Sequence, residues 1–178
     1  MPNPTQPIIG PYDSQPAACR DHDPRAAVVA GQIAVLISER LPQIRVEHIG
    51  STSVAGCAGN GIVDLMIAVP DGATEGVKGA LESLGFQKQT GRDPFPEDRP
   101  MRVGSVSHDG ETFWLHVHVI PANSPEVDEL RFFRTCLRND PELLRLYVAR
   151  KQEIIAGGTT DPIDYRREKG KFIKEVLG

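Results

Sequence analysis

The chain has 178 residues, of which 39% are hydrophobic and 25% are charged, a composition typical of one globular domain with an apolar core. Its 20 lysine and arginine residues against 24 aspartate and glutamate residues give a net charge of -4, which excludes a general basic surface for nucleic acid. No apolar stretch approaches the roughly 20 residues that cross a bilayer, and the amino terminus lacks a signal-peptide pattern, so we expect a cytoplasmic protein without a membrane partner.

The amino-terminal residues 1–22 predict an extended arm, because prolines interrupt this segment at short intervals. These prolines are Pro2, Pro4, Pro7, Pro11 and Pro16. Residues 23–178 predict a single domain, since no linker-like or repetitive segment divides them. The domain opens on Asp23-Pro24, which predicts a helix that runs to about Leu41. The Asp side chain can cap free N–H groups, and proline at the first helical position has no N–H to leave unpaired.

A strand, a loop, a second strand and a helix are predicted next. Residues 44–49 alternate in polarity and predict a strand, and the Gly- and Ser-rich residues 50–61 predict a loop. The nearly continuous apolar run over 62–69, with Asp64 as its one carboxylate, predicts a strand that is buried on both faces. Residues 73–84 predict a helix that ends at a glycine.

The second half of the chain predicts a hairpin and a helical end. After a short strand near Phe86, prolines make residues 90–100 a long irregular loop. Residues 101–107 and 111–120 predict two strands joined at His108-Asp109-Gly110, since Asp-Gly tolerates the positive φ angles of tight turns. Three helices are predicted to close the chain, at residues 125–138, 141–156 and 162–177. Each opens on a capping residue followed by proline, at Ser124-Pro125, Asp140-Pro141 and Asp161-Pro162.

The most specific local signal lies where the first predicted strand ends. Gly50, Ser51 and Thr52 would present backbone N–H groups and hydroxyls at one edge of a sheet, and such a turn can cradle a phosphate. Asp64 on the following strand can hold a divalent cation against the same phosphate, since hard cations choose carboxylate oxygens. An isolated turn of this kind is more often only a polar turn. The carboxylate favours function, because a buried charge needs a cation, a hydrogen-bond network or a proton.

A wider pattern resembles one family. Residues 46–54 (VEHIGSTSV), Gly56 and residues 62–65 (IVDL) are similar to the defining motif of the GrpB-like proteins, which belong to the nucleotidyltransferase superfamily. Further similar segments, in family order, are Pro11-Tyr12-Asp13, Leu115-His116-Val117, residues 130–134, Leu137-Arg138, Tyr147, Lys151, Tyr165 and residues 169–173. The resemblance covers about residues 7–177. It implies an α+β (α/β) fold in which helices flank a nucleotidyltransferase-like mixed sheet, with a three-helix carboxy-terminal segment.

One departure limits the activity that this resemblance implies. Nucleotidyltransferases usually carry two carboxylates, spaced by one residue, on the strand after Gly-Ser, where both point the same way and clamp metal. Here Asp64 is the first, and Met66 stands in the second position, as is common in GrpB-like sequences. The resemblance therefore implies an enzyme or a remnant enzyme and puts two-metal nucleotidyl transfer in doubt.

His116 and His118 alternate on one predicted strand, so both rings project from the same face, where they suit a metal ion or a phosphate group. Two histidines satisfied on a half-buried sheet face are an equal alternative. Residues 115–121 also resemble the histidine-triad signature of nucleotide hydrolases, but Trp114 stands where the first histidine of that triad would be. This second resemblance explains only that segment and is the weaker one.

The predicted carboxy-terminal helices place cations in two settings. Lys151 and Lys169 each share a helix face with aromatic and aliphatic residues, and an inward lysine needs a partner, which favours an anionic ligand over snorkelling to solvent. The preceding helix carries a basic ridge, for which we expect pairing with nearby acids. The ridge consists of Arg131, Arg134 and Arg138.

Together these signals predict a protein that binds a nucleoside triphosphate or a related phosphorylated small molecule with one Mg²⁺, and that transfers a nucleotidyl group if it is active. The expected catalytic residues are Asp64, His48 and His116. The expected phosphate-binding residues are Gly50, Ser51, Thr52, Lys151 and Lys169. The expected metal ligands are Asp64, His116 and His118. One alternative is a non-catalytic module that binds a nucleotide or a CoA-related metabolite, and a weaker one is a histidine-triad-like hydrolase. The sequence leaves the oligomeric state open.

Overall fold

The computed structural model describes residues 6–178. In chain order its elements are α1 (Arg25–Arg40), β1 (Val46–Ile49), the 3-10 turn η1 (Ser51–Ser53), β2 (Val63–Val69), α2 (Thr74–Ser83), β3 (Gln87–Lys88), β4 (Met101–His108), β5 (Glu111–Pro121), α3 (Pro125–Asn139), α4 (Pro141–Ala156) and α5 (Pro162–Leu177). These bounds follow the sequence-predicted elements closely. The first strand differs, because pairing begins at Val46 and leaves residues 44–45 outside the sheet.

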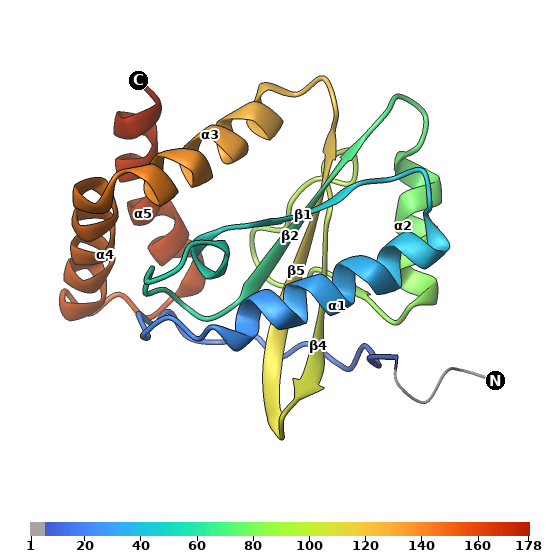
Figure 1. Cartoon of the computed structure of the whole chain (residues 1–178), viewed down its shortest axis with the longest axis horizontal. Helices are drawn as coiled ribbons and strands as arrows, with labels where there is room; N and C mark the ends of the chain where they lie inside the picture. Colours follow the sequence, from blue (N-terminus) through green and yellow to red (C-terminus); the bar gives the residue numbers. More distant parts are fainter. Residues whose placement is uncertain (1–5) are drawn as a thin grey trace.

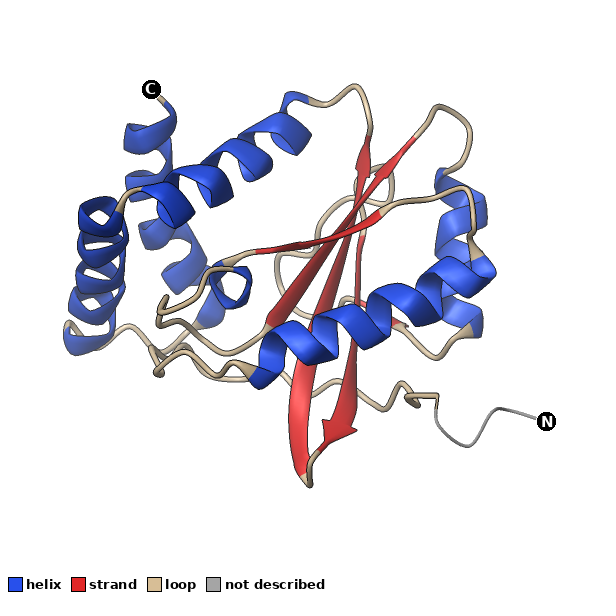
Figure 2. Cartoon of the chain, viewed as in Figure 1, coloured by secondary structure: helices blue, strands red, loops and turns tan. Residues whose placement is uncertain are grey.

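The strands form one five-stranded sheet in the order β1-β2-β5-β4-β3 (Figures 1 and 2). The β2 and β5 strands are parallel, and the other neighbouring pairs are antiparallel, so the predicted mixed sheet is confirmed. The register places Asp64 of β2 beside His116 of β5, and Ile49 of β1 beside Asp64 on its other side. Side chains of residues paired in this way project from the same face of the sheet.

One face of the sheet is covered by α1 and α2 and carries the main core. Leu65 of β2 and Leu115 and Val117 of β5 are fully buried there against apolar residues of α1, such as Ile33. The opposite face packs only in part: Met66 and Ile120 meet α3 in a smaller apolar cluster. Figure 1 shows α1 and α2 on one side of the molecule and α3, α4 and α5 grouped on the other.

The three carboxy-terminal helices pack on the loop after β1. Val54 and Cys57 of that loop are buried with Phe133, Leu137 and Tyr147 of α3 and α4. This cluster fixes the Gly-Ser-Thr turn relative to the helices that carry the predicted lysines. Three helix starts follow the expected caps, since Ser124, Asp140 and Asp161 each accept hydrogen bonds from backbone N–H groups of the helix that they precede. The start of α1 differs, because Pro24 occupies the cap position, and Asp23 accepts from the Arg25 N–H at 3.0 Å.

The arm before α1 is irregular over residues 6–22, as predicted, and it docks on the domain. Gly10 pairs with Ser105 of β4, and Arg20 pairs with Gly59 of the loop before β2. The arm therefore pairs with β4 where β3 has ended and then reaches the loop before β2. Residues 1–5 of the predicted arm lie outside the described residues, and the division into one arm and one domain stays a prediction.

The predicted hairpin turn is confirmed by its backbone. Asp109 has φ 49° and Gly110 has φ 77°, the pair of positive angles that a two-residue hairpin loop requires. The β5 strand that this turn starts carries both site histidines. No helix within residues 6–178 is both long enough and apolar enough to cross a membrane.

Candidate functional site

Asp64, His116 and His118 form a compact cluster on the face of the sheet away from α1. Asp64 Oδ1 lies 3.4 Å from His116 Nδ1 and 3.2 Å from His118 Nε2. One ligand atom from each residue lies within 4.8 Å of the others. Their side chains keep 22%, 18% and 14% of their surface exposed, so all three remain open to solvent. The parallel register of β2 and β5 and the alternation along β5 produce this grouping.

Two further contacts extend the cluster into a chain of polar side chains. The Tyr12 hydroxyl of the arm lies 2.8 Å from His116 Nε2. At the other end, Arg99 Nη1 lies 3.1 Å from His118 Nδ1, and Arg99 Nε donates to Glu126 Oε2 at 2.9 Å. Tyr12, Arg99 and Glu126 were not predicted as site residues. The arm, the loop before β4 and the start of α3 supply them.

The electrostatics of the cluster keep Asp64 ionised. Burial alone would raise the pKa of Asp64, but hydrogen bonds from His116 and His118 hold it well below its usual range. Burial lowers the pKa of His118, although the Asp64 charge opposes this change. Burial, with the Asp64 charge, raises the pKa of Tyr12 to about 12. At neutral pH the cluster therefore combines a carboxylate, a neutral His118 and a protonated phenol.

Gly50 brings the predicted phosphate turn against the carboxylate. Its φ of 73° favours glycine, and a Cβ at this position would lie 2.7 Å from Asp64 Oδ2. The turn and the acid of the next strand thus share one edge of the sheet, as the sequence predicted.

Lys151 reaches the same turn from α4. This lysine is fully buried, and its Nζ donates to Ser51 Oγ at 2.9 Å and to the Ala58 carbonyl. It also lies 4.2 Å from the centroid of the Tyr147 ring. Burial lowers the pKa of Lys151, and the nearby Lys169 charge lowers it further. The structure therefore confirms that Lys151 points inward and fixes Ser51, whereas a contact between Lys151 and a ligand stays a prediction.

Lys169 of α5 also points inward, half-buried, with its Nζ 5.3 Å from the centroid of the Tyr165 ring. Burial lowers the pKa of Lys169, and the charge of Asp64 opposes this change in part. Within residues 6–178 Lys169 makes no hydrogen bond and no ion pair that would explain this position.

His48 and Thr52 do not join the cluster, in contrast to the prediction. The register pairs His48 with Leu65, which places its side chain on the α1 face of the sheet. There His48 Nε2 lies 2.8 Å from Thr52 Oγ1, and Thr52 Oγ1 donates to the Ile62 carbonyl at 3.4 Å. Thr52 is buried, so its hydroxyl stabilises the loop and has no access to a ligand. Burial lowers the pKa of His48 to about 4.

The predicted basic ridge of α3 is paired within the protein. Arg131 Nε donates to Glu47 Oε1 at 3.0 Å, and Arg134 Nη1 donates to the His48 carbonyl at 2.8 Å. Arg138 Nη2 donates to the Ser53 carbonyl at 2.7 Å. The arginines therefore tie α3 to β1 and to the turn that follows it. Arg131 and Arg134 meet an acid, Glu47, as expected, whereas Arg138 makes no ion pair among the described residues.

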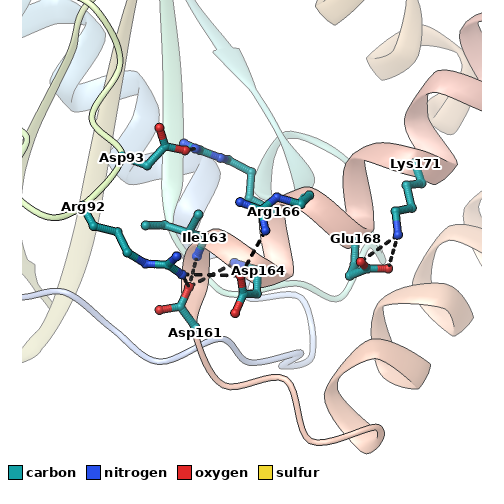
Figure 3. Close-up of polar contacts among 9 residues, drawn as sticks. Arg92, Asp93, Asp161, Ile163, Asp164, Arg166, Glu168 and Lys171 are labelled. Carbon is teal, nitrogen blue, oxygen red and sulfur yellow. Dashed lines mark hydrogen bonds and ion pairs between the residues drawn. The ribbon is translucent and has the colours of Figure 1, made fainter.

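The loop over residues 90–100 is attached to the start of α5. Arg92 Nη2 lies 2.8 Å from Asp161 Oδ1, and Arg166 Nη2 lies 2.9 Å from Asp93 Oδ2 (Figure 3). A cavity of about 360 Å³ lies beside these bonds on α5. Its cations are largely paired with neighbouring acids, as in the Lys171–Glu168 pair that Figure 3 shows, so this cavity is a weaker candidate than the Asp64 cluster.

Phe95 of the same loop packs beside the cluster. Its ring centroid lies 5.7 Å from that of His118, and the guanidinium carbons of Arg99 and Arg166 lie 4.2 and 4.8 Å from the Phe95 centroid. The loop thereby holds Arg99 against His118. Proline content predicted the irregular loop but not this contact.

Comparisons with known proteins identify the family. The family described as GrpB protein matches residues 16–178. A UPF0157 protein of Pseudomonas aeruginosa is 32% identical over 146 residues, which cover 82% of this chain and 59% of that protein. A UPF0157 protein of Streptomyces coelicolor is 31% identical over 171 residues, which cover 95% of this chain and 87% of that protein. The chain thus spans less than two thirds of its Pseudomonas relative.

Solved structures agree with the fold. The crystal structure of the conserved protein GrpB from Enterococcus faecalis matches with a TM-score of 0.63 at 22% identity, over 90% of this chain and 100% of that one. Cid1 in complex with its short product ApU matches with a TM-score of 0.51 at 14% identity, over 76% of this chain and 42% of that one. The structure of the GLD-2/RNP-8 complex matches with a TM-score of 0.57 at 11% identity, over 86% of this chain and 58% of that one. These likenesses show a nucleotidyltransferase-like fold, and with the family match they establish that the chain belongs to the GrpB family.

Proposed function

We propose that this GrpB-family protein binds a nucleoside triphosphate or a related phosphorylated small molecule, together with a divalent cation, at the Asp64 cluster. The observation that carries the proposal is that the ionised, partly exposed Asp64 lies against the Gly50-Ser51 turn, that Lys151 contacts Ser51 of this turn, and that Lys169 points inward without an ion pair among the described residues. The carboxylate can hold a cation, and the lysines can neutralise phosphate charge.

Ser51 can offer a donor to a ligand. Its Oγ accepts from the Lys151 ammonium, so its hydroxyl hydrogen can turn to a ligand oxygen in place of the neighbouring Tyr147 hydroxyl. Gly50 leaves space for a ligand to approach the backbone next to Asp64. Lys169 lies over the Tyr165 ring but makes no hydrogen bond or ion pair among the described residues, and it would gain one with a phosphate group. The proposed phosphate site consists of Gly50, Ser51, Lys151 and Lys169. Thr52 is not part of it, because its side chain is buried.

The Mg²⁺ predicted from the sequence fits this site only in part. Mg²⁺ prefers oxygen ligands, and Asp64 is the one carboxylate of the cluster. Met66, in the position of a second carboxylate, is fully buried against Ile49 and Ile120 and serves the core. Among residues 6–178, this face therefore offers no two-carboxylate clamp for Mg²⁺.

The binding proposal is tested by calorimetric titration of ATP with Mg²⁺ into the wild-type protein and into Asp64→Asn. We expect the variant to lose at least about tenfold in affinity, since one charge-assisted contact of this kind contributes about 1.4 kcal/mol or more. Asp71→Asn changes an exposed turn carboxylate and is the matched control. Equal affinity in wild type and Asp64→Asn would remove Asp64 from the site.

A non-catalytic module is the second candidate, and the buried Met66 favours it. Incubation with a mixture of nucleoside triphosphates and Mg²⁺ separates the two: pyrophosphate release supports nucleotidyl transfer, whereas saturable binding without release supports the module. The weaker histidine-triad hydrolase would instead show metal-independent hydrolysis that His116→Asn abolishes. The family match over residues 16–178 favours the first two candidates over that one.

A further inference from the structure

We infer that the Asp64 cluster selects a divalent transition cation that accepts imidazole nitrogen, with Zn²⁺ as the representative, over Mg²⁺, and that Arg99 competes with this cation for His118. The inference deepens the proposed function by naming the class of its cation. It rests on the proposed function because it takes the Asp64 cluster as the cation site, but it does not require nucleotide binding.

The donor set favours a transition cation. Two of the three candidate ligand atoms are imidazole nitrogens, and one is a carboxylate oxygen. Imidazole suits Zn²⁺ and its neighbours in the first transition row, whereas Mg²⁺ takes oxygen ligands in near-octahedral geometry. Because Met66 supplies no oxygen beside Asp64, a hard cation would find one protein ligand here and a transition cation would find three.

The distances from Asp64 to the two histidines match such a site, and all three donor atoms lie within 4.8 Å of one another. Zinc bonds of about 2.0 to 2.2 Å in tetrahedral geometry separate neighbouring ligand atoms by about 3.4 Å. Asp64 Oδ1 lies 3.4 Å from His116 Nδ1 and 3.2 Å from His118 Nε2. Three protein ligands leave one position open for water or for a phosphate oxygen, which is the arrangement of zinc sites that bind or activate a ligand.

The surroundings of His116 agree with metal ligation. If Nδ1 of His116 binds the cation, the proton of the ring lies on Nε2. The Tyr12 oxygen, 2.8 Å from Nε2, can accept that proton in a hydrogen bond. A hydrogen-bond partner on the second nitrogen of this kind orients a metal-binding histidine.

The contact between His118 and Arg99 is incompatible with a cation bound to His118. If Nε2 of His118 binds the cation, Nδ1 must carry the proton. The atom facing Nδ1 at 3.1 Å is Arg99 Nη1, and a guanidinium group has only donors. Two donors cannot form a hydrogen bond, so the cation and the Arg99 contact exclude each other. Arg99 can leave Nδ1 and still keep Glu126 and the Phe95 ring as partners.

The experiment measures metal binding alone, without nucleotide. Protein freed of metal by a chelator is titrated with Zn²⁺ and with Mg²⁺ by calorimetry, and with Co²⁺ by its visible absorption. We expect one equivalent of Zn²⁺ at least about 100-fold tighter than Mg²⁺, and a loss of at least about tenfold in His116→Asn and in His118→Asn. His108→Asn is the matched control, since His108 lies on the same hairpin, 3.6 Å from Asp109. Circular dichroism verifies that each variant is folded.

Arg99→Gln tests the competition. The glutamine oxygen can accept the Nδ1 proton that Arg99 cannot, so this variant should bind Zn²⁺ about tenfold more tightly than wild type. Unchanged or weaker binding in Arg99→Gln overturns the competition. Mg²⁺ binding as tight as Zn²⁺ binding, or Zn²⁺ binding that survives both histidine substitutions, overturns the metal assignment.

The failure of this inference is distinguishable from the failure of the proposed function. Nucleotide binding that depends on Asp64, without selectivity for Zn²⁺, contradicts only the metal assignment. Selective Zn²⁺ binding without any nucleotide affinity contradicts only the nucleotide ligand.

Discussion

The two faces of the sheet use the same strands for different purposes. On the α1 face, Leu65, Leu115 and Val117 are fully buried in the main apolar core. On the opposite face, their chain neighbours Asp64, His116 and His118 remain partly exposed and contact one another. Alternation along β2 and β5 thus separates a stabilising face from a chemical face by one residue. This difference predicts that stability and ligand binding can be changed independently.

The largest expected effect concerns the stabilising face. Ile33 of α1 is fully buried in the main core, away from Asp64. Ile33→Ala should lower the free energy of unfolding by about 3 kcal/mol, because a cavity replaces packed methyl groups. Urea denaturation measures this change, and titration of the folded variant should show unchanged ATP affinity. If folded Ile33→Ala bound ATP much more weakly than wild type, stability and ligand binding would not be independent.

A smaller effect is expected from the chemical face. Lys169→Gln should weaken ATP binding about tenfold, or about 1.4 kcal/mol, because a phosphate would lose a charged partner. Its stability should change little, since Lys169 makes no internal ion pair within residues 6–178. Lys171→Gln is the matched control on the same helix, where Lys171 is exposed and pairs with Glu168. Equal affinity in the two variants would exclude Lys169 from the phosphate site.

The smallest expected effect is the pH dependence that His48 contributes. Burial lowers the pKa of His48 to about 4 in the folded protein, whereas the pKa of a histidine in an unfolded chain is about 6.5. Neutral His48 therefore contributes fully to the free energy of unfolding above pH 6.5, and this contribution is lost as the pH falls towards 4. His48→Gln should reduce the stability difference between pH 7.5 and pH 5 by about 1 kcal/mol after allowance for solvent screening. Urea midpoints at the two pH values measure it, and an unchanged difference would contradict a buried neutral His48.

Local signals in the sequence predicted most of the fold. Caps such as Asp140-Pro141 and the Asp109-Gly110 turn act on neighbouring residues, so they are readable without the structure. The grouping of His116 with His118 is local as well, since it follows from alternation on one strand. Their meeting with Asp64 depends on the parallel register of β2 and β5, and the family resemblance implied a mixed sheet but not this pairing.

The errors and omissions at the site come from long-range geometry. His48 was assigned to the site because it precedes the Gly-Ser turn, but the antiparallel register of β1 turns its ring to the α1 face. Tyr12 was missed because it meets His116 from 104 positions away. Arg99 was missed because its contacts with His118 and Glu126 depend on the path of an irregular loop. Periodic patterns in the sequence do not predict contacts of this kind, because the residues lie far apart in the chain.

NMR spectra of the histidine side chains test most directly whether the ligand binds on the Asp64 face. His116 and His118 lie on that face, and His48 lies on the α1 face. In ¹H–¹⁵N correlation spectra recorded during titration with ATP and a divalent cation, we predict saturable shifts of the His116 and His118 signals and nearly constant His48 and His108 signals. Asp64→Asn should abolish the shifts. Saturable binding that leaves His116 and His118 unmoved, or that moves His48 instead, would contradict a ligand site on the Asp64 face.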